Sequence, residues 1–260
     1  FKDRKQAEEL IAFLKEEPPL TAVVRLKEKK KETKNPPLLY NLAELQNDCS
    51  KMFKISPDET LKIVQELYEK KMVTYPRTDA RVLSTAVAKE IYKNIGGLRQ
   101  YPPVAAFASE ILDQGSYKNI SKTRYVNDKQ ITDHYAIVPT GQGGGGAGRL
   151  SPLSEKVYQV ICRRFLSIFY PAAVYQKYTL DLERRKEHFF ASFKVLSEPG
   201  YLKVADVSPE NEDQAPKVDR TVLLDMLAEL KKGDILTLAE LKVKEGETSP
   251  PKRYTSGSMI

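Results

Sequence analysis

The residues with the clearest chemical potential lie in the stretch 72–83, which reads MVTYPRTDARVL. Tyr75 carries a phenol whose ordinary pKa is about 10. It becomes a nucleophile toward a phosphodiester only where the phosphate is held in place and nearby cations or a proton acceptor assist the attack. Arg77 follows two residues later, and side chains at i and i+2 share one face of an extended backbone. Its guanidinium would then clamp the phosphate that the phenol attacks.

Three further side chains add polar groups to this motif. Thr78 can donate a hydrogen bond to a phosphate oxygen, and Asp79 is placed to orient Arg77 or a hydroxyl. His134, one of two histidines, can supply another donor or a proton relay. Simpler roles stay open for all of them. Tyr75 is one of 14 tyrosines and can be a packing residue, YPRTD can be a turn with an Arg–Asp ion pair, and the histidine can be structural.

The elements that must position Tyr75 are helical on its N-terminal side. Residues 41–72 carry apolar side chains at helical spacing, with N-cap signals at Asn41 and Ser56. They predict two helices around the short turn 54–56, the outline of a helix-turn-helix, which often serves only packing. Pro76 disfavours a helical Tyr75, so the tyrosine is expected on an extended or turning segment. The two apolar stripes are Leu42, Leu45, Cys49, Met52 and Phe53, and then Leu61, Val64, Leu67 and Tyr68.

The rest of the chain alternates between helical and strand-like patterns. The sequence predicts an α+β protein in which a β-rich domain (1–37 and 170–260) carries an inserted, all-helical, helix-turn-helix-like domain (38–169). Further expected helices are residues 1–17, 85–95, 103–113 and 153–169, with a shorter one within 219–232. Expected strands fall in 21–31, 178–182, 189–195 and 235–243, and expected loops in 116–131 and 206–219.

Composition and low-complexity segments narrow the class of protein. The net charge of +7 and pI of about 9.1 suit a polyanionic partner, or simply a solvated basic surface. The chain has no apolar run near the roughly 18 residues of a membrane span, and no signal-peptide pattern at its start. Cys49 and Cys162 form no CxxC pair, which disfavours a zinc site or disulfide framework. The glycine-rich run 141–148 lacks the GK[ST] ending of a phosphate loop and favours a linker, natural or engineered.

Several motifs together resemble the type IA DNA topoisomerases, particularly the topoisomerase III branch. YPRTD with its approach LYEKKMVT resembles the active-site motif of that family. Four other segments follow in the family's order and extend the resemblance over nearly the full chain. They are PPLLYNLAELQNDC, TDHYAIVPT, LSEKVYQVICRRFLSIFYP and SPPKRYTSGSMI. They resemble the entry to the helical domain, the histidine motif, the helix returning to the β-rich arch, and the segment leading out of the arch.

The resemblance implies a role for each residue of the motif. Tyr75 matches the nucleophile that forms a 5′-phosphotyrosyl link, and Arg77 matches the arginine that steadies the scissile phosphate. Thr78 and Asp79 complete the motif. His134 matches a histidine that contacts DNA phosphate near the cleavage point. The family often has a second histidine where this chain has Tyr135, to which no role is assigned.

The resemblance also implies partners. The parent enzyme cleaves single-stranded DNA, opens a gate by moving the arch, passes another strand and reseals the break without ATP. Its Mg²⁺ is held by a Toprim domain of the same polypeptide, whose glutamate and DxD-type cluster are absent here, so the chain looks like a fragment with the arch and tyrosine domains. It would be monomeric, cytoplasmic and nucleoid-associated in a bacterium, without membrane contact, and unable to relax DNA alone. Two rivals stay open: a non-catalytic helix-turn-helix DNA-binding module and a recombinase- or relaxase-like tyrosine enzyme.

Overall fold

The computed structural model describes residues 3–142, 150–205, 220–248, 250, 251, 253, 254 and 259. The expected acidic loop 206–219 and the glycines at 143–146 and 148 lie outside this part of the chain. The described residues form two compact units, one with a β-sheet and one mostly helical. The chain leaves the sheet unit after Lys34 and returns to it at Val174, so the predicted α+β class with a helical insertion is confirmed.

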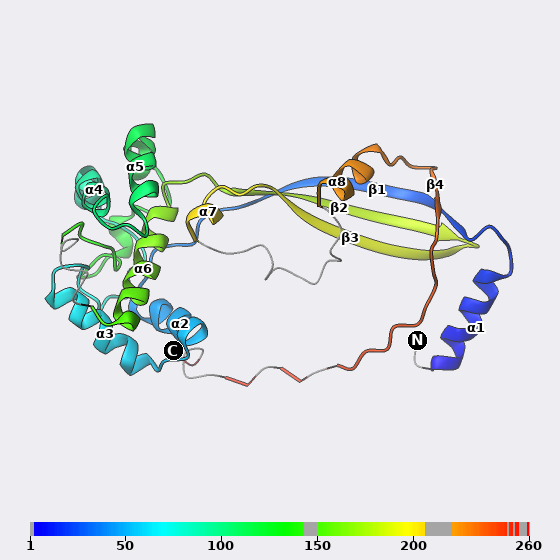
Figure 1. The fold of residues 1–260 in the computed structure, drawn as a ribbon, viewed down its shortest axis with the longest axis horizontal. Helices are drawn as coiled ribbons and strands as arrows, with labels where there is room; N and C mark the ends of the chain where they lie inside the picture. The colour runs from blue at the N-terminus through cyan, green and yellow to red at the C-terminus, as the bar shows by residue number, and fades with distance from the viewer. Residues whose placement is uncertain are drawn as a thin grey trace. The chain divides into compact units, whose positions relative to one another are not determined.

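The sheet unit takes its described residues from Phe1–Lys34, Val174–Glu198 and Pro209–Pro251. Its sheet has the order β3-β2-β1-β4 (Figure 1). Strands β2 and β3 form an antiparallel hairpin whose tip residues, Arg185 and Lys186, both have positive φ angles of 50° and 71°, as tight hairpin turns of this hand require. The strands are β1 (Thr21–Lys34), β2 (Ala173–Arg184), β3 (Glu187–Glu198) and β4 (Ile235–Thr237).

The helix α8 (Arg220–Glu229) packs against part of one face of the sheet (Figure 1). Alternation along β2 directs Tyr178 and Leu180 to this face, where they form a buried cluster with Leu227 of the helix. The last expected strand, residues 235–243, pairs with β1 only over Ile235–Thr237. The expectation of a longer strand there is wrong, because alternation marks a possible strand but does not supply a pairing partner.

Arg184 joins the end of β2 to the helix α1 (Arg4–Lys15) in the same unit. Its guanidinium is buried and donates to four backbone oxygens: those of Leu14 at 2.7 Å, Glu17 at 2.5 Å, Pro19 at 3.2 Å and Thr21 at 2.8 Å. The last carbonyls of a helix have no partner within the helix. Arg184 therefore satisfies oxygens at the helix end and along the connection into β1.

Replacing Arg184 by methionine is expected to lower the free energy of unfolding of the sheet unit by about 2 kcal/mol or more, because four buried or partly buried hydrogen bonds from a charged donor are lost. Arg25→Met is the matched control. Its ion pair with Glu183 is short, at 2.5 Å, but the Arg25 side chain is 51% exposed, so the loss should be clearly smaller than that of Arg184→Met. Urea denaturation of the two variants measures both values. Equal losses would contradict the structural role of Arg184.

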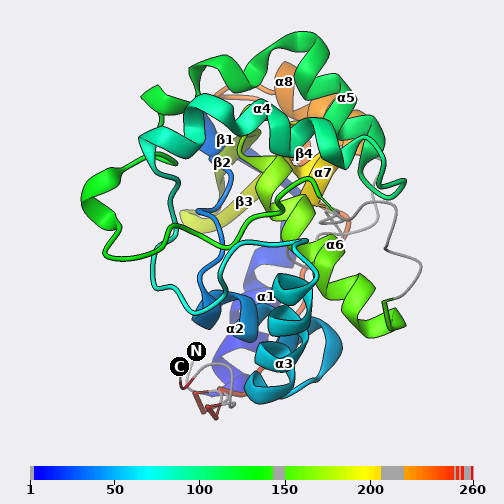
Figure 2. The ribbon, with the colours of Figure 1, turned by 90° about the vertical axis from the view of Figure 1, so that its left-hand side faces the viewer.

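The helical unit surrounds a single large cluster of buried apolar side chains. In both views α6 lies between the α4–α5 pair and the α2–α3 pair (Figures 1 and 2). None of the described helices has the length and apolar character needed to cross a membrane. The helices are α2 (Leu42–Phe53), α3 (Pro57–Glu69), α4 (Thr85–Leu98), α5 (Ala105–Gln114), α6 (Pro152–Ser167) and the short α7 (Leu202–Ala205).

The predicted caps of the two helices before Tyr75 are confirmed. The Asn41 side chain accepts a hydrogen bond from the Glu44 amide at 2.9 Å, and Ser56 accepts one from the Glu59 amide at 3.1 Å. Two members of the predicted apolar stripes are exposed, however. Met52 is 49% exposed and Tyr68 is 39% exposed. Helical spacing predicts which face of a helix is apolar, but it does not predict which part of that face packs against other elements.

Two other parts of the helical unit differ from the sequence prediction. The expected loop 116–131 contains the 3₁₀ helices η1 (Ser116–Lys122) and η2 (Asp128–Gln130), which are too short to show a helical period. Residues after β3, expected in the β-rich domain, pack instead on the helical unit. The Val204 side chain is fully buried in its core, and its carbonyl accepts from Arg163 of α6 at 2.7 Å.

Candidate active site

Tyr75 lies just after α3, on a segment held beside residues 136–140. Val73 and Pro139 form an antiparallel bridge. The Thr74 amide donates to the Val138 carbonyl at 3.0 Å, and the Thr140 amide donates to the Met72 carbonyl at 2.9 Å. These bonds bring the MVTYPRTD and DHYAIVPT stretches together, so Tyr75 and His134 become neighbours although they are far apart in the sequence.

Two threonine hydroxyls fasten this segment on either side of Tyr75. Thr74 Oγ1 donates to the Ala136 carbonyl and accepts from the Val138 amide, both at 2.9 Å. Thr78 Oγ1 donates to the His134 carbonyl at 2.8 Å and accepts from the Ala80 amide at 3.1 Å. Each hydroxyl has one hydrogen to donate. Both are therefore committed to the backbone that positions Tyr75.

The expected donation from Thr78 to a phosphate oxygen is not what the structure shows. The Thr78 side chain is only 7% exposed, and its hydrogen is given to the His134 carbonyl. Thr78 acts as a positioning residue, because it fixes the backbone of His134 relative to the motif. Sequence reasoning could not see this, since the acceptor lies in a distant segment.

Thr78→Val is expected to lower the free energy of unfolding by about 1–3 kcal/mol, because the substitution keeps the side-chain volume but removes the hydrogen bond that the buried Thr78 hydroxyl donates to the His134 carbonyl. Thr78→Ser keeps the hydroxyl and should lose less. Thermal denaturation followed by circular dichroism compares the three proteins. If the valine variant lost no more stability than the serine variant, the hydrogen bond from the Thr78 hydroxyl would not carry the expected effect.

The backbone turns directly after Tyr75. The Thr78 amide donates to the Pro76 carbonyl at 3.0 Å, which closes a three-residue turn around Arg77. The backbone from Tyr75 to Arg77 is therefore turned, which was one of the two alternatives for Tyr75, and the fully extended backbone on which the shared face depends is not present. Both Arg77 and Asp79 are exposed. Within the described residues neither side chain forms an ion pair or hydrogen bond, so Asp79 does not orient Arg77 and the guanidinium is available to an anion.

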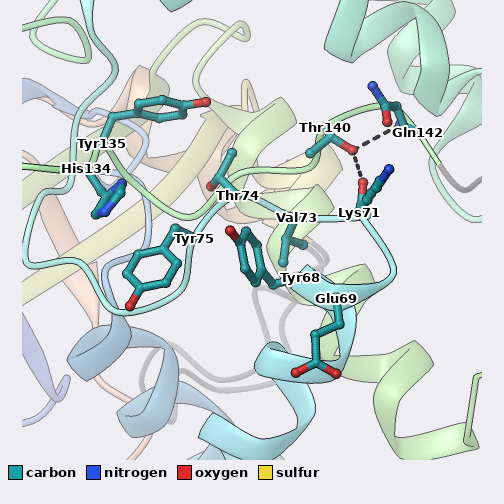
Figure 3. A pocket seen from close by; sticks show the side chains of 10 residues that line it. All are labelled: Tyr68, Glu69, Lys71, Val73, Thr74, Tyr75, His134, Tyr135, Thr140 and Gln142. Carbon is teal, nitrogen blue, oxygen red and sulfur yellow. Dashed lines mark hydrogen bonds between the residues drawn. The ribbon is translucent and has the colours of Figure 1, made fainter.

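A cavity of about 550 Å³ lies beside Tyr75. The Tyr75 ring is held between two others: its centroid lies 4.4 Å from that of His134 with the planes at 42°, and 5.4 Å from that of Tyr68 in an edge-to-face arrangement (Figure 3). His134 is exposed, whereas Tyr75 is half-buried. The other lining residues are Glu69, Lys71, Val73, Thr74, Tyr135, Thr140 and Gln142.

The sequence did not identify most of the residues that line the cavity. It placed Tyr68 in an apolar stripe and assigned no role to Tyr135, which is half-buried here. Burial raises the pKa of the Tyr135 phenol, so it stays uncharged at neutral pH. The only available signal was position, since Tyr68 and Lys71 directly precede the motif and Tyr135 follows His134. Which of these side chains enclose a cavity depends on how the two segments pair.

The magnesium ion implied by the family resemblance finds no suitable ligands in the described part of the chain. No group of three or more His, Cys, Asp or Glu side chains there is arranged to hold a metal. Among the described residues of the cavity wall, Glu69 is the sole carboxylate, whereas Mg²⁺ sites usually combine carboxylates, phosphates and water in octahedral geometry. No chemical step proposed below passes through a metal on this chain.

Comparisons with known proteins agree on one family. A family model described as DNA topoisomerase matches residues 1–260. DNA topoisomerase 3 of Bacillus licheniformis is 38% identical over 225 residues, which cover 86% of this chain and 29% of that protein. DNA topoisomerase 3 of Bacillus subtilis is 37% identical over 227 residues, covering 86% and 30%. The chain thus spans about a third or less of the length of these relatives.

A solved structure shows the same fold. Full-length topoisomerase I from Thermotoga maritima superposes with a TM-score of 0.66 over 99% of this chain and 38% of its own, at 21% identity. That identity is too low to transfer residue roles, but it supports the arrangement of sheet and helices described above. With a family match along its whole length and relatives above 30% identity, the chain belongs to the type IA DNA topoisomerase family.

Proposed function

We propose that Tyr75 is the nucleophile of a DNA strand-passage reaction and forms a transient covalent link to a single strand. One observation carries the proposal. The phenol ring is held in a cavity wall between Tyr68 and His134, and Arg77, two residues along the chain, is exposed and its guanidinium has no partner among the described residues. A held phenol and an available cation are the two groups that attack on a phosphodiester requires.

In the proposed step the Tyr75 oxygen attacks phosphorus, and the bond from phosphorus to the 3′ oxygen breaks. The phenol loses a proton and the departing 3′ oxygen gains one, so the products are a 5′-phosphotyrosine and a free 3′-hydroxyl. Arg77 balances the charge of the phosphate. Resealing is the reverse attack by the 3′-hydroxyl, which restores the phenol. The ester retains the energy of the broken bond, so no ATP is consumed.

The two units divide the work in this proposal. The helical unit serves as the tyrosine domain, and the sheet unit serves as the arch whose movement opens a gate for the passing strand. The partners are single-stranded DNA and a Toprim domain of the same parent polypeptide, which would bring Mg²⁺ for resealing in the bacterial nucleoid. By itself the chain is expected to bind single strands weakly and to relax no supercoils.

The proposal is tested in a chimera in which this chain replaces the matching segment of Bacillus licheniformis DNA topoisomerase 3. The chimera is mixed with a single-stranded oligonucleotide labelled at its 3′ end and then denatured with detergent. A covalent 5′ link leaves the 3′ label on the protein, and peptide mapping should locate it at Tyr75. Label from the 5′ end should not be retained.

A label found on the protein from the 5′ end, or mapped to another tyrosine, would contradict the proposed chemistry. If the chimera bound duplex DNA with a base preference and formed no covalent product, the helix-turn-helix module would be favoured instead. The two outcomes are distinguished by the same gel and a duplex-binding assay.

A further inference from the structure

Aromatic rings from two separate segments line the cavity beside Tyr75. Tyr68 closes α3 and Tyr75 follows it, while His134 and Tyr135 come from the segment that pairs with them. Figure 3 shows the Tyr75 hydroxyl at the end of its ring away from Tyr135. The volume of about 550 Å³ lies within the range of small-ligand sites. Flat π faces of this kind stack on nucleobases of any identity.

The charges of the described lining residues favour a neutral occupant. Glu69 contributes one carboxylate and Lys71 one ammonium, and neither forms an ion pair with another described residue. Their charges offset each other, whereas a phosphate site needs an excess of cations. Arg77 is not part of the lining. A phosphate is thus expected outside the cavity near Arg77, and an uncharged planar group inside it.

The polar groups of the wall divide into those used by the protein and those left for a ligand. Thr140 Oγ1 donates to the Lys71 carbonyl at 2.5 Å and accepts from the Gln142 amide at 3.1 Å (Figure 3), which holds this side of the cavity in shape. The side chains of Gln142, Glu69 and Lys71 provide donors and acceptors of both kinds. Base edges carry the same mixture.

We propose that this cavity binds one unpaired nucleobase of the single strand, adjacent to the phosphate that Tyr75 attacks. The inference rests on the proposed function, since it places the base next to the same nucleophile. Tyr68 and Tyr135 supply the stacking surfaces, and Tyr75 contributes its ring to the wall. Binding a base here would hold the strand in register, with its scissile phosphate beside the Tyr75 hydroxyl and Arg77.

The test uses the full chain with tyrosines labelled with ¹³C and two ligands that differ only by the base. Thymidine 5′-monophosphate is expected to shift the ring resonances of Tyr68 and Tyr135 in NMR spectra, and 2-deoxyribose 5-phosphate is not. Tyr68→Leu should weaken thymidine monophosphate binding roughly tenfold. The matched control is Tyr92→Leu, because Tyr92 is a similarly exposed tyrosine of the helical unit outside the cavity, and it should bind as wild type.

Equal shifts with both ligands would show that phosphate rather than base is bound, and would overturn the proposal. So would the absence of shifts at Tyr68 and Tyr135, or equal weakening by the Tyr92 control. Tyr75→Phe separates this inference from the proposed function, because it keeps the ring and should bind the nucleotide while losing the covalent link. A covalent link at Tyr75 without nucleotide binding would refute the base site alone.

Discussion

Tyr75→Phe in the Bacillus licheniformis chimera is expected to reduce covalent DNA adduct formation on the order of a thousandfold or more, to the background of the assay. The substitution removes only the attacking oxygen. The ring remains to contact His134 and Tyr68, at centroid distances of 4.4 and 5.4 Å in the parent chain. Single-strand binding should therefore persist, and a fluorescence anisotropy titration measures it beside the adduct assay.

The free energy of unfolding of Tyr75→Phe shows whether the loss of adduct formation could come from a destabilised fold. Within the described residues the Tyr75 hydroxyl forms no hydrogen bond, so its removal should change the free energy of unfolding by less than about 0.5 kcal/mol. Tyr92→Phe, which alters an exposed tyrosine of the helical unit outside the cavity, should leave adduct formation unchanged. A Tyr75→Phe protein that still forms the adduct would show that another residue is the nucleophile.

Gly97→Ala is expected to lower the free energy of unfolding of the helical unit by about 2 kcal/mol or more. Gly97 lies in α4, and a Cβ atom built on it would stand 1.9 Å from the carbonyl oxygen of Gly141. That oxygen belongs to the backbone and cannot rotate away, so the segment around it must shift. The neighbours of Gly141, Thr140 and Gln142, line the cavity, and the shift should disturb it as well.

Gly96→Ala is the matched control, one residue away on the same helix. Nothing lies within 4 Å of a Cβ built there, so alanine should stabilise the protein by about 0.5–1 kcal/mol through its better helix propensity. Chemical denaturation of the two variants should thus give opposite signs. Equal effects would mean that helix propensity, and not the contact with Gly141, governs this pair of glycines.

Local features of the fold follow from short stretches of sequence. The caps at Asn41 and Ser56 depend on a side chain and an amide three residues later, so the sequence alone identified both helix starts. The motif YPRTD, together with other motifs in a fixed order, likewise identified the family. These signals are local or ordered along the chain, and tertiary packing is not needed to recognise them.

The candidate site was decided by tertiary structure. Tyr75 and Arg77 were expected on one extended face, but the backbone turns there, as the hydrogen bond from the Thr78 amide to the Pro76 carbonyl shows. Thr78 was expected to face phosphate, and it is buried on the His134 carbonyl instead. Tyr68 was expected in the core, and it lines the cavity. By itself the sequence determined the motif, the family and most helices. Only the pairing of two distant segments decided which side chains surround Tyr75, because hydrogen bonds and ring contacts between them have no local signature.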